Sequence, residues 1–428
     1  MVILSRPLRI ALLSYRSKPH CGGQGVYVRH LSRELCGLGH HVEVFSGQPY
    51  PELDPGPVLR EVPSLDLYRD DDPFRTPRWG EYRDGADVLE TVMMWGGAFP
   101  EPLTFSLRAR RVLAERARDF DVVHDNQGLG YGMLGVRRLG LPLVTSIHHP
   151  ISVDKRIDLA SSGRLAALNK RRWYGFVRMQ ARVARRLAGT GPLITVSESS
   201  RDDICRDFRV RPEHVHIIPL GVDTRIFRPR TEPRVPGRIV AVASADSPIK
   251  GTGTLLRAVG KLTTDTDAHL IIVGQPAPAT KRLAAQLSLA DRVTFTHGLS
   301  DEAFSALLAS AEMAVVPSLY EGFSLPAVEH MASGTPLVAS RTGALPEVTG
   351  DAAVLVTPGE DEELAAVLRR LYHSPAERAA LADRGLRRVG ERFAWPAVAQ
   401  ATVGQYLAAM ERLATKTART TRKGQVEC

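Results

Sequence analysis

Short apolar runs of strand length alternate with longer helix-length runs throughout the second half of this chain. This alternation is typical of strands joined by crossover helices, and it builds a parallel sheet covered by helices on both faces. We predict strands at 238–244, 269–273, 293–297, 313–317, 336–340 and 353–356. We predict the intervening helices at 251–262, 278–287, 301–310, 326–333 and 361–372.

The first half of the chain begins with the same pattern. Residues 8–15 predict a strand, residues 21–25 a glycine-containing loop, and residues 26–38 an amphipathic helix that ends at Gly39. A second strand is predicted at 41–46. The pattern continues with strands at 121–124, 143–147 and 193–196 and with helices at 101–119 and 163–188. The fold class is therefore α/β, with two Rossmann-like, doubly wound domains facing a central cleft.

Residues 229–237, with three prolines and a glycine, indicate a linker between the two domains. We accordingly place an N-terminal domain at 1–228 and a C-terminal domain at 229–394. The polar and basic residues 414–428 predict a disordered tail. Residues 47–100 are rich in proline, aspartate and aromatic residues, and a loop of this length suits either an acceptor-recognition lobe or a structural excursion.

Composition and charge restrict the class of protein. The chain has 428 residues, of which 43% are hydrophobic and 24% charged, and no apolar run is long enough for a membrane span. No signal-peptide pattern precedes the first strand, and the four cysteines have no metal-ligand spacing, so we predict a cytoplasmic protein without a metal. The net charge of +9 favours acidic ligands. No nucleic-acid-binding motif is visible, and we predict no nucleic-acid partner.

The segment from Tyr320 to Gly334 carries two carboxylates, Glu321 and Glu329, on either side of a helix start. Pro326 suits the first helical position and Ser324 a capping position. The N–H groups of Phe323, Ser324 and Leu325 would then point out of the helix N-terminus, which attracts phosphate. Amide donors between two fixed acceptors suit a ligand that has both phosphates and hydroxyls, such as a nucleotide-sugar.

An ordinary capped helix with two exposed glutamates is the alternative interpretation of this segment. The flanking residues favour a site, because 313–318 and 336–340 predict buried strands. The carboxylates then follow the carboxyl end of a strand, where open α/β sheets bind ligands. The Gly23-Gln-Gly25 sequence lacks the third glycine of a dinucleotide fingerprint, and no acidic residue ends the second strand, which argues against a dehydrogenase.

Taken together, these motifs resemble the retaining glycosyltransferases of family 4, which have the GT-B architecture, over nearly the whole chain. The segments that carry the resemblance are 22–27, 145–148, 194–199, 218–229, 250–251, 317–329 and 343–348. The resemblance implies transfer of a hexose from a nucleotide-sugar with retention at the anomeric carbon and without a metal or another cofactor. We lean towards a UDP-sugar, with a GDP-sugar also open, and the acceptor is a glycan, a lipid or a small molecule.

Residue roles follow from the resemblance. Glu321 would hold hydroxyls of the donor sugar, Glu329 the ribose, and Lys250 the pyrophosphate, while His148 would contact the donor sugar near the reacting centre. The catalytic residues are then His148 and Glu321. The expected donor-binding residues are Gly22, Gly23, Ser244, Lys250, Phe323, Ser324, Leu325 and Glu329, and the expected acceptor contacts are Gln24, Asn126 and Gln127. The N-terminal domain would bind the acceptor, and a helix at about 395–413 would cross back to it.

One residue departs from the family pattern. The family usually has an arginine six residues before the lysine, and this chain has Ser244 there. Arg16 or Arg341 could replace that cation by location. The loss keeps open a non-catalytic partner subunit that binds nucleotide-sugar. A related GT-B enzyme, such as a phosphorylase or an epimerase, is a separate alternative.

The predicted helix 163–188 is rich in arginine and has an apolar side. Basic amphipathic helices can bind anionic lipid at the inner face of a membrane. A helix packed on the sheet with a solvated basic face is the alternative.

Overall fold

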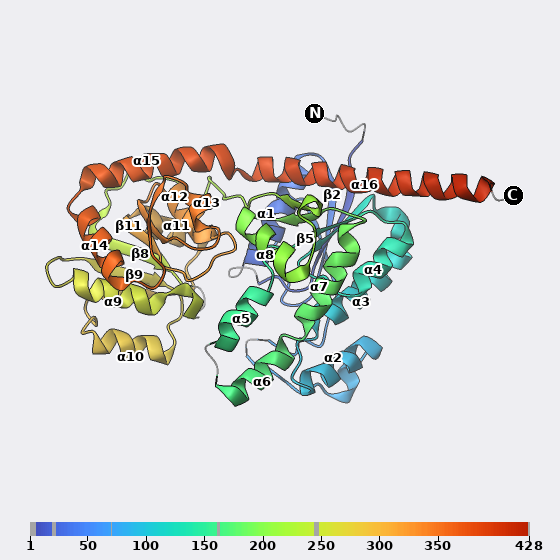
Figure 1. Ribbon diagram of the computed structural model, residues 1–428, viewed down its shortest axis with the longest axis horizontal. Coiled ribbons are helices and arrows are strands. Elements are labelled where there is room, and N and C mark those ends of the chain that lie inside the picture. The colour runs from blue at the N-terminus through green and yellow to red at the C-terminus, as the bar shows by residue number, and fades with distance from the viewer. Residues whose placement is uncertain (1–5, 19–22, 70, 161–162, 244–247, 427–428) are drawn as a thin grey trace. The chain divides into compact units, whose positions relative to one another are not determined.

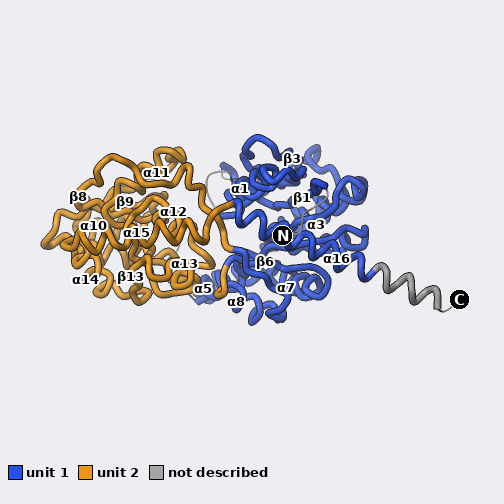
Figure 2. Tube along the Cα trace, turned by 90° about the horizontal axis from the view of Figure 1, so that it is seen from above, with its two compact units in different colours: residues 1–196, 200–218, 396–428 blue, residues 197–199, 219–395 orange. Residues whose placement is uncertain are grey.

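The computed structural model describes residues 6–18, 23–69, 71–160, 163–243 and 248–426. The chain forms two compact units, shown in different colours in Figure 2. Unit 1 comprises residues 1–196, 200–218 and 396–428, and unit 2 comprises residues 197–199 and 219–395. No helix among the described residues is long and apolar enough to cross a membrane.

Unit 1 contains a seven-stranded sheet with the order β3-β2-β1-β4-β5-β6-β7, and every pairing in it is parallel. The strands are β1 Arg9–Ser14, β2 His41–Ser46, β3 Val58–Glu61, β4 Val122–Asn126, β5 Leu143–Ser146, β6 Leu193–Thr195 and β7 Val215–Ile217. The helices are α1 Gly23–Gly37, α2 Gly85–Trp95, α3 Glu101–Glu115, α4 Gly132–Val136, α5 Ser152–Ala160, α6 Arg164–Trp173, α7 Phe176–Ala188, α8 Glu198–Phe208 and α16 Trp395–Val426.

Unit 2 contains a six-stranded parallel sheet with the order β10-β9-β8-β11-β12-β13. Figure 1 labels β8, β9 and β11 of this sheet. The strands are β8 Val235–Val242, β9 His269–Val273, β10 Val293–Thr296, β11 Ala311–Val316, β12 Leu337–Ser340 and β13 Ala353–Val356. The helices are α9 Thr252–Leu262, α10 Pro278–Gln286, α11 Asp301–Ala309, α12 Leu325–Ala332, α13 Leu345–Thr349, α14 Asp361–Tyr372 and α15 Pro375–Arg392. Short 3-10 helices are η1 Trp79–Glu81, η2 Ala117–Asp119, η3 Arg137–Leu139, η4 Pro212–His214 and η5 Pro248–Lys250.

The strand order explains where ligands can bind. In both sheets the chain starts in an inner strand, winds to one edge and then returns to build the other side, so the order reverses beside β1 and beside β8. Open sheets of this kind bind ligands at the carboxyl ends of the strands at the reversal. The inner strands are continuous apolar runs because helices cover both faces; Ile10, Leu12 and Leu13 of β1 are fully buried. The prediction of two Rossmann-like sheets is confirmed.

The domain boundary lies about ten residues earlier than predicted. The main segment of unit 2 begins at Pro219. Residues 229–237, which were predicted to be a linker, include the first residues of β8. The prediction that a helix from about 395 belongs to the N-terminal domain agrees with the assignment of residues 396–428 to unit 1.

The predicted disordered tail at 414–428 differs from the structure, in which α16 continues to Val426. Alanine, lysine and arginine are good helix formers, so a helix already started extends through them at little cost.

Two further elements differ from the sequence prediction. The predicted helix 163–188 is two helices, α6 and α7, which are separated at Tyr174 and Gly175. Glycine is a poor interior helix residue, and here it precedes the first residue of α7. Strand β3 was missed because its four residues lie at the sheet edge and are mostly exposed, so they lack an apolar run.

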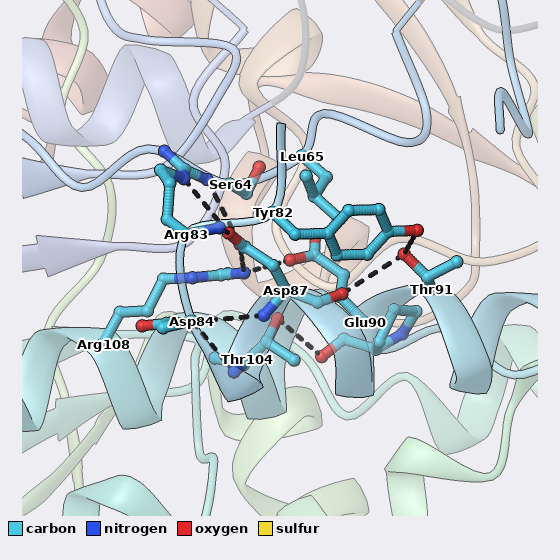
Figure 3. A network of polar contacts seen from close by, with 12 residues as sticks. Ser64, Leu65, Tyr82, Arg83, Asp84, Asp87, Glu90, Thr91, Thr104 and Arg108 are labelled. Carbon is cyan, nitrogen blue, oxygen red and sulfur yellow. Dashed lines mark hydrogen bonds and ion pairs between the residues drawn. The ribbon is translucent and has the colours of Figure 1, made fainter. Parts of the chain in front are cut away.

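Residues 47–100 form a lobe with its own small core, instead of a plain loop. Leu65, Leu67, Tyr68 and Met94 are buried together, and Trp173 packs against them. A second layer is polar: Arg108 contacts both Asp87 and Glu90, and Arg83 also pairs with Asp87 (Figure 3). Breaking a buried charge pair leaves an uncompensated charge, so this network ties α2 to α3.

Candidate functional site

The loop before α12 places a row of backbone amides at the carboxyl end of β11. Ser324 is the N-cap of α12, as predicted, but its backbone is left-handed, with φ 86° and ψ 80°. Its side chain makes no capping hydrogen bond, and its buried Oγ has no partner among the described residues. A capping serine needs an extended backbone to reach the amides of the first turn, which explains the missing bond. Pro326 is consequently the second helical residue, because the helix begins at Leu325.

The strained backbone at Ser324 is itself informative. A non-glycine residue in this region costs about 1–3 kcal/mol, and such residues gather at functional sites. Phe323 anchors the loop in the core of unit 2, because its buried ring packs edge-on against Phe393 with centroids 5.7 Å apart. The loop is therefore fixed in a conformation that leaves the first-turn amides of α12 free of a side-chain cap.

Glu321 is held in this loop by two side chains. Lys250 Nζ lies 2.9 Å from Glu321 Oε1, and Ser318 Oγ donates to the same oxygen at 2.7 Å. The main-chain oxygen of Glu321 accepts from the Ala344 N–H at 2.9 Å. Only 9% of Glu321 is exposed. The carboxylate is therefore held in one orientation by the bonds to its Oε1. A group that accepts hydrogen bonds from a ligand needs such a fixed orientation.

Lys250 reaches Glu321 because β8 and β11 are neighbours in the sheet. Lys250 ends η5, and Gly251 follows it in a left-handed conformation with φ 65°. A Cβ on Gly251 would lie 2.0 Å from the Pro317 oxygen, so only glycine allows this close approach. Likewise, a Cβ on Gly343 would lie 2.3 Å from the Glu321 oxygen. The sequence prediction assigned separate partners to Lys250 and Glu321, and the structure brings the two side chains together.

Glu329 lies on α12 behind the amide row and is half-buried. Burial raises the pKa of its carboxyl to about 7, and the charge of Asp301 adds to the rise. A glutamate that titrates near neutral pH is suited to exchange hydrogen bonds with a hydroxyl-bearing ligand.

In unit 1, the carboxyl ends of β4 and β5 bring His148, Asn126 and Gln127 together. His148 Nε2 and Asn126 Oδ1 are 2.7 Å apart. The backbone N–H of His148 donates to Gln127 Oε1 at 2.6 Å, and Gln127 Nε2 donates to the His149 oxygen at 2.9 Å. Gln127 has φ 62°, a second strained position. Asn126 and Gln127, expected as acceptor contacts, therefore orient His148.

The ring of His148 is neutral. Burial lowers its pKa to about 3, and His149 adds to the effect. With Nε2–H donating to Asn126, the lone pair of Nδ1 remains, and Nδ1 has no partner among the described residues. Asn126 Nδ2 likewise lacks a partner in the part of the chain that the structure describes. A neutral imidazole cannot neutralise a phosphate, but it can accept a hydrogen bond from a hydroxyl.

Tyr27 supports this ring from α1, and sequence reasoning did not assign it a role. The two rings meet nearly at right angles, with centroids 4.6 Å apart. A buried chain of polar groups continues behind them: His124 Nε2 contacts Ser146 Oγ at 2.7 Å, and His124 Nδ1 contacts the Tyr406 hydroxyl at 2.8 Å. Tyr406 lies on α16, 282 residues from His124, so no local pattern could have indicated this contact.

The glycine loop is described only from Gly23, so Gly22 lies outside the described residues. Gly23 begins α1, and a Cβ there would meet nothing within 4 Å. Gly25 is the crowded glycine, since its Cβ would lie 2.1 Å from the Lys18 oxygen. Gln24, expected as an acceptor contact, hydrogen-bonds the Tyr15 side chain.

Ser244 also lies outside the described residues, and the two candidate replacement cations differ in their contacts. Arg16 contacts the buried carboxylate of Glu101 at 3.0 Å and the Tyr68 oxygen at 3.0 Å. Burial raises the pKa of Glu101 to about 7, although Arg16 opposes the rise. Arg341 is exposed and donates one long hydrogen bond, to the Leu355 oxygen at 3.4 Å, so most of its five N–H donors stay available and it remains a candidate for the replacement cation. Arg16 therefore stabilises unit 1, which argues against a replacement role.

A pocket of about 660 Å³ lies at the carboxyl ends of β9 and β10 in unit 2. This size is within the range of small-molecule sites. The pocket is lined by Gly274, Gln275, Pro276, Ala277, Lys281, Phe295 and His297. Sequence reasoning missed this pocket because its lining comes from the loop after β9, from α10 and from the end of β10 with the residue that follows it.

Most basic residues of the predicted helix 163–188 remain exposed in α6 and α7, whereas Lys170 is half-buried and pairs with Asp158. On α7, Arg178, Arg182, Arg185 and Arg186 are exposed while Val177, Val183 and Leu187 are buried against the sheet. This arrangement agrees with the packed-helix interpretation, and contact with an anionic membrane stays a prediction.

Comparison with known proteins covers both units. A family described as Glycosyltransferase Family 4 matches residues 21–226, and one described as Glycosyl transferases group 1 matches residues 236–374. The MMP alpha-(1->4)-mannosyltransferase of Mycolicibacterium hassiacum is 57% identical over 95% of this chain and 100% of the relative.

Solved structures share the fold at lower sequence identity. The sucrose-phosphate synthase of Thermosynechococcus elongatus has a TM-score of 0.72 and 23% identity, over 94% of this chain and 98% of its own. HepE of Anabaena, solved with UDP and glucose, has a TM-score of 0.67 and 17% identity, over 94% of this chain and 100% of its own.

Proposed function

The chain belongs to glycosyltransferase family 4, and from that premise we propose that it transfers mannose from a nucleotide-sugar to a sugar acceptor, with retention and without a metal. The structural observation that carries this proposal is Glu321, oriented by Lys250 and Ser318 beside the free amides of α12. Mannose, and an acceptor hydroxyl at ring position 4, are supported by the name of the relative that is 57% identical. The nucleotide is a UDP or GDP group, and HepE, which was solved with UDP, supports the first.

During the transfer, negative charge develops on the pyrophosphate and positive charge on the sugar, and both need stabilisation. Breaking the bond between the anomeric carbon and the phosphate oxygen builds negative charge on the pyrophosphate. The helix N-terminus of α12 and the ammonium of Lys250 would stabilise that charge. An ammonium has three N–H donors, so Lys250 can hold a phosphate oxygen while still contacting Glu321. Glu321 would accept hydrogen bonds from the sugar hydroxyls and fix the sugar against this cradle.

The new bond forms between the anomeric carbon and the acceptor oxygen on the face that the phosphate leaves. The acceptor proton passes to the departing phosphate, so no second carboxylate base is needed, unlike the pair used in glycoside hydrolysis. For His148 we propose that Nδ1 accepts a hydrogen bond from a substrate hydroxyl. Among the described residues no three His, Cys, Asp or Glu side chains are grouped as metal ligands, and Lys250 supplies positive charge that a metal would otherwise provide.

The proposal is tested by incubating the full chain with UDP-glucose, UDP-mannose and GDP-mannose and an oligomannoside, with and without a chelator. We expect a product only with a mannose donor, with the donor's anomeric configuration by NMR and at an undiminished rate after chelation. No transfer from any donor would favour the non-catalytic partner subunit. Conversion of a donor without acceptor would identify an epimerase, and cleavage of a glycan by inorganic phosphate a phosphorylase.

Replacing Glu329 by glutamine is expected to weaken nucleotide binding by at least about tenfold, because a carboxylate accepting hydroxyl hydrogen bonds is worth roughly 1.5–3 kcal/mol. Calorimetric titration with UDP, GDP and ADP measures the loss.

In the unmodified chain, the affinity for the nucleotide should rise with pH, because the pKa of Glu329 is about 7 and its ionised form is the better acceptor of hydrogen bonds. Nucleotide phosphates also titrate near pH 6, a contribution that the Glu329→Gln variant retains. Equal pH dependence in both proteins would contradict the role.

A further inference from the structure

A second pocket, in unit 1, is lined by positive charge and shares no residue with the donor and acceptor contacts assigned above, although two of its residues, Arg186 and Leu187, belong to α7. Its volume is about 770 Å³. Three segments form it, namely the end of α4 with η3, the end of α7, and α16. Figure 1 labels these three α-helices. It is lined by Leu134, Arg137, Arg138, Arg186, Leu187, Leu413 and Lys416. We call this set the basic pocket.

None of the described residues that line the basic pocket is acidic. The side chains of Arg137, Arg138 and Arg186 make no ion pair or hydrogen bond with any residue that the structure describes, whereas many other arginines of this chain pair with aspartate or glutamate. Burial lowers the pKa of Arg137, and no carboxylate counters that effect. Arg137 is partly buried, whereas Arg138 and Arg186 are exposed at the rim of the pocket. Like charges gathered in this way repel one another, and a bound anion would relieve that cost.

The strand connections place the basic pocket at the amino-terminal edge of the sheet. Arg137 and Arg138 come just before β5, and Arg186 and Leu187 just before β6. Asn126 and His148 come at the ends of β4 and β5, at the opposite edge. Four residues of β5 separate the two edges by roughly 13 Å. A ligand in the basic pocket therefore occupies a different place from one that contacts His148.

The remaining lining is apolar. Leu187 is buried, and Leu134 and Leu413 are partly buried, so aliphatic surface lies beside the guanidinium groups. Guanidinium groups bind phosphate oxygens in pairs, with geometry that an ammonium lacks. We propose that the basic pocket is a binding site for a phosphate-bearing ligand, held by Arg137, Arg138 and Arg186 with its apolar part against the three leucines. This ligand is either a soluble phosphate ester or the headgroup of an anionic lipid.

The proposal does not depend on the transferase activity, because its residues hold no part of the donor site. Inorganic pyrophosphate is the probe for a soluble ligand. It is titrated into a Lys250→Ala variant, so that the site in unit 2 contributes little. Adding Arg137→Gln and Arg186→Gln should weaken the remaining binding by at least about tenfold, since each charged hydrogen bond lost is worth roughly 1.5–3 kcal/mol. Glutamine keeps the aliphatic stem and the helix propensity of α7.

The matched control carries Arg178→Gln and Arg185→Gln, which remove the same charge from the exposed face of α7 outside the pocket. The lipid arm measures co-sedimentation with vesicles of phosphatidylcholine mixed with phosphatidylglycerol. If the Arg137→Gln and Arg186→Gln pair weakens pyrophosphate binding and the control pair does not, the ligand is a soluble phosphate ester. A loss specific to that pair with vesicles alone identifies a lipid headgroup. Equal effects of the two pairs on both probes, or no effect of either pair, would overturn the proposal.

Discussion

Replacing Glu321 by alanine is expected to lower the rate of sugar transfer by at least about a hundredfold, the usual cost of removing one fixed group that acts in the transition state. The carboxylate is mostly buried, and Lys250 and Ser318 fix its Oε1. Alanine would remove the acceptor for the sugar hydroxyls and also free Lys250 to move. Steady-state transfer with the best nucleotide-sugar measures the effect. A Glu321→Gln variant, which keeps the shape but not the charge, should also lose most of the rate.

The same strand provides a control. Glu312 lies near the amino end of β11 and contacts Arg378 at 2.8 Å, whereas Glu321 follows the carboxyl end. Glu312→Gln removes a half-buried paired carboxylate of the same sheet, so it should lower stability but leave the rate per folded molecule unchanged. A stability loss of about 1 kcal/mol shifts the unfolding temperature by about 2–4 °C. Unchanged turnover in Glu321→Ala, with the fold intact, would remove Glu321 from the proposed mechanism.

Replacing His148 by alanine is expected to lower the rate of transfer about as much as the Glu321→Ala change does. The neutral ring presents Nδ1 in one orientation, fixed by Asn126 at Nε2 and by the ring of Tyr27. Alanine would remove that hydrogen-bond acceptor and leave a cavity beside Tyr27. Because a lost ring can also cost about 2–5 kcal/mol of stability, the rate is measured alongside thermal unfolding. His148→Asn restores a polar side chain but not the acceptor position, so it should stay inactive.

His149 is the matched control for His148. Its ring pairs with Asp154 at 2.8 Å and lies one residue away in the same segment. His149→Ala should retain transfer, with at most a small loss of stability. If the two alanine variants lost equal activity, the effect would belong to the segment and not to the ring of His148.

Much of the fold followed from short-range patterns. The strands of unit 2 lie within about three residues of their predicted bounds. The inner strands β11 and β12 are buried apolar runs whose character is set by their own residues. The edge strand β3 and the break between α6 and α7 were missed for the complementary reason. An exposed edge strand needs no apolar run, and a helix break depends on what each half packs against.

The candidate site divides in the same way. The sequence by itself determined which chemical groups follow the carboxyl ends of the strands, because strand periodicity and helix starts are encoded within a few neighbouring residues. It did not determine that Lys250 pairs with Glu321, that Asn126 orients His148, or that Arg16 is held by Glu101. These contacts join residues 71, 22 and 85 positions apart. Only the tertiary structure decides them, because strand order in the sheet sets which strand ends become neighbours, and strand order is a property of the whole packed unit.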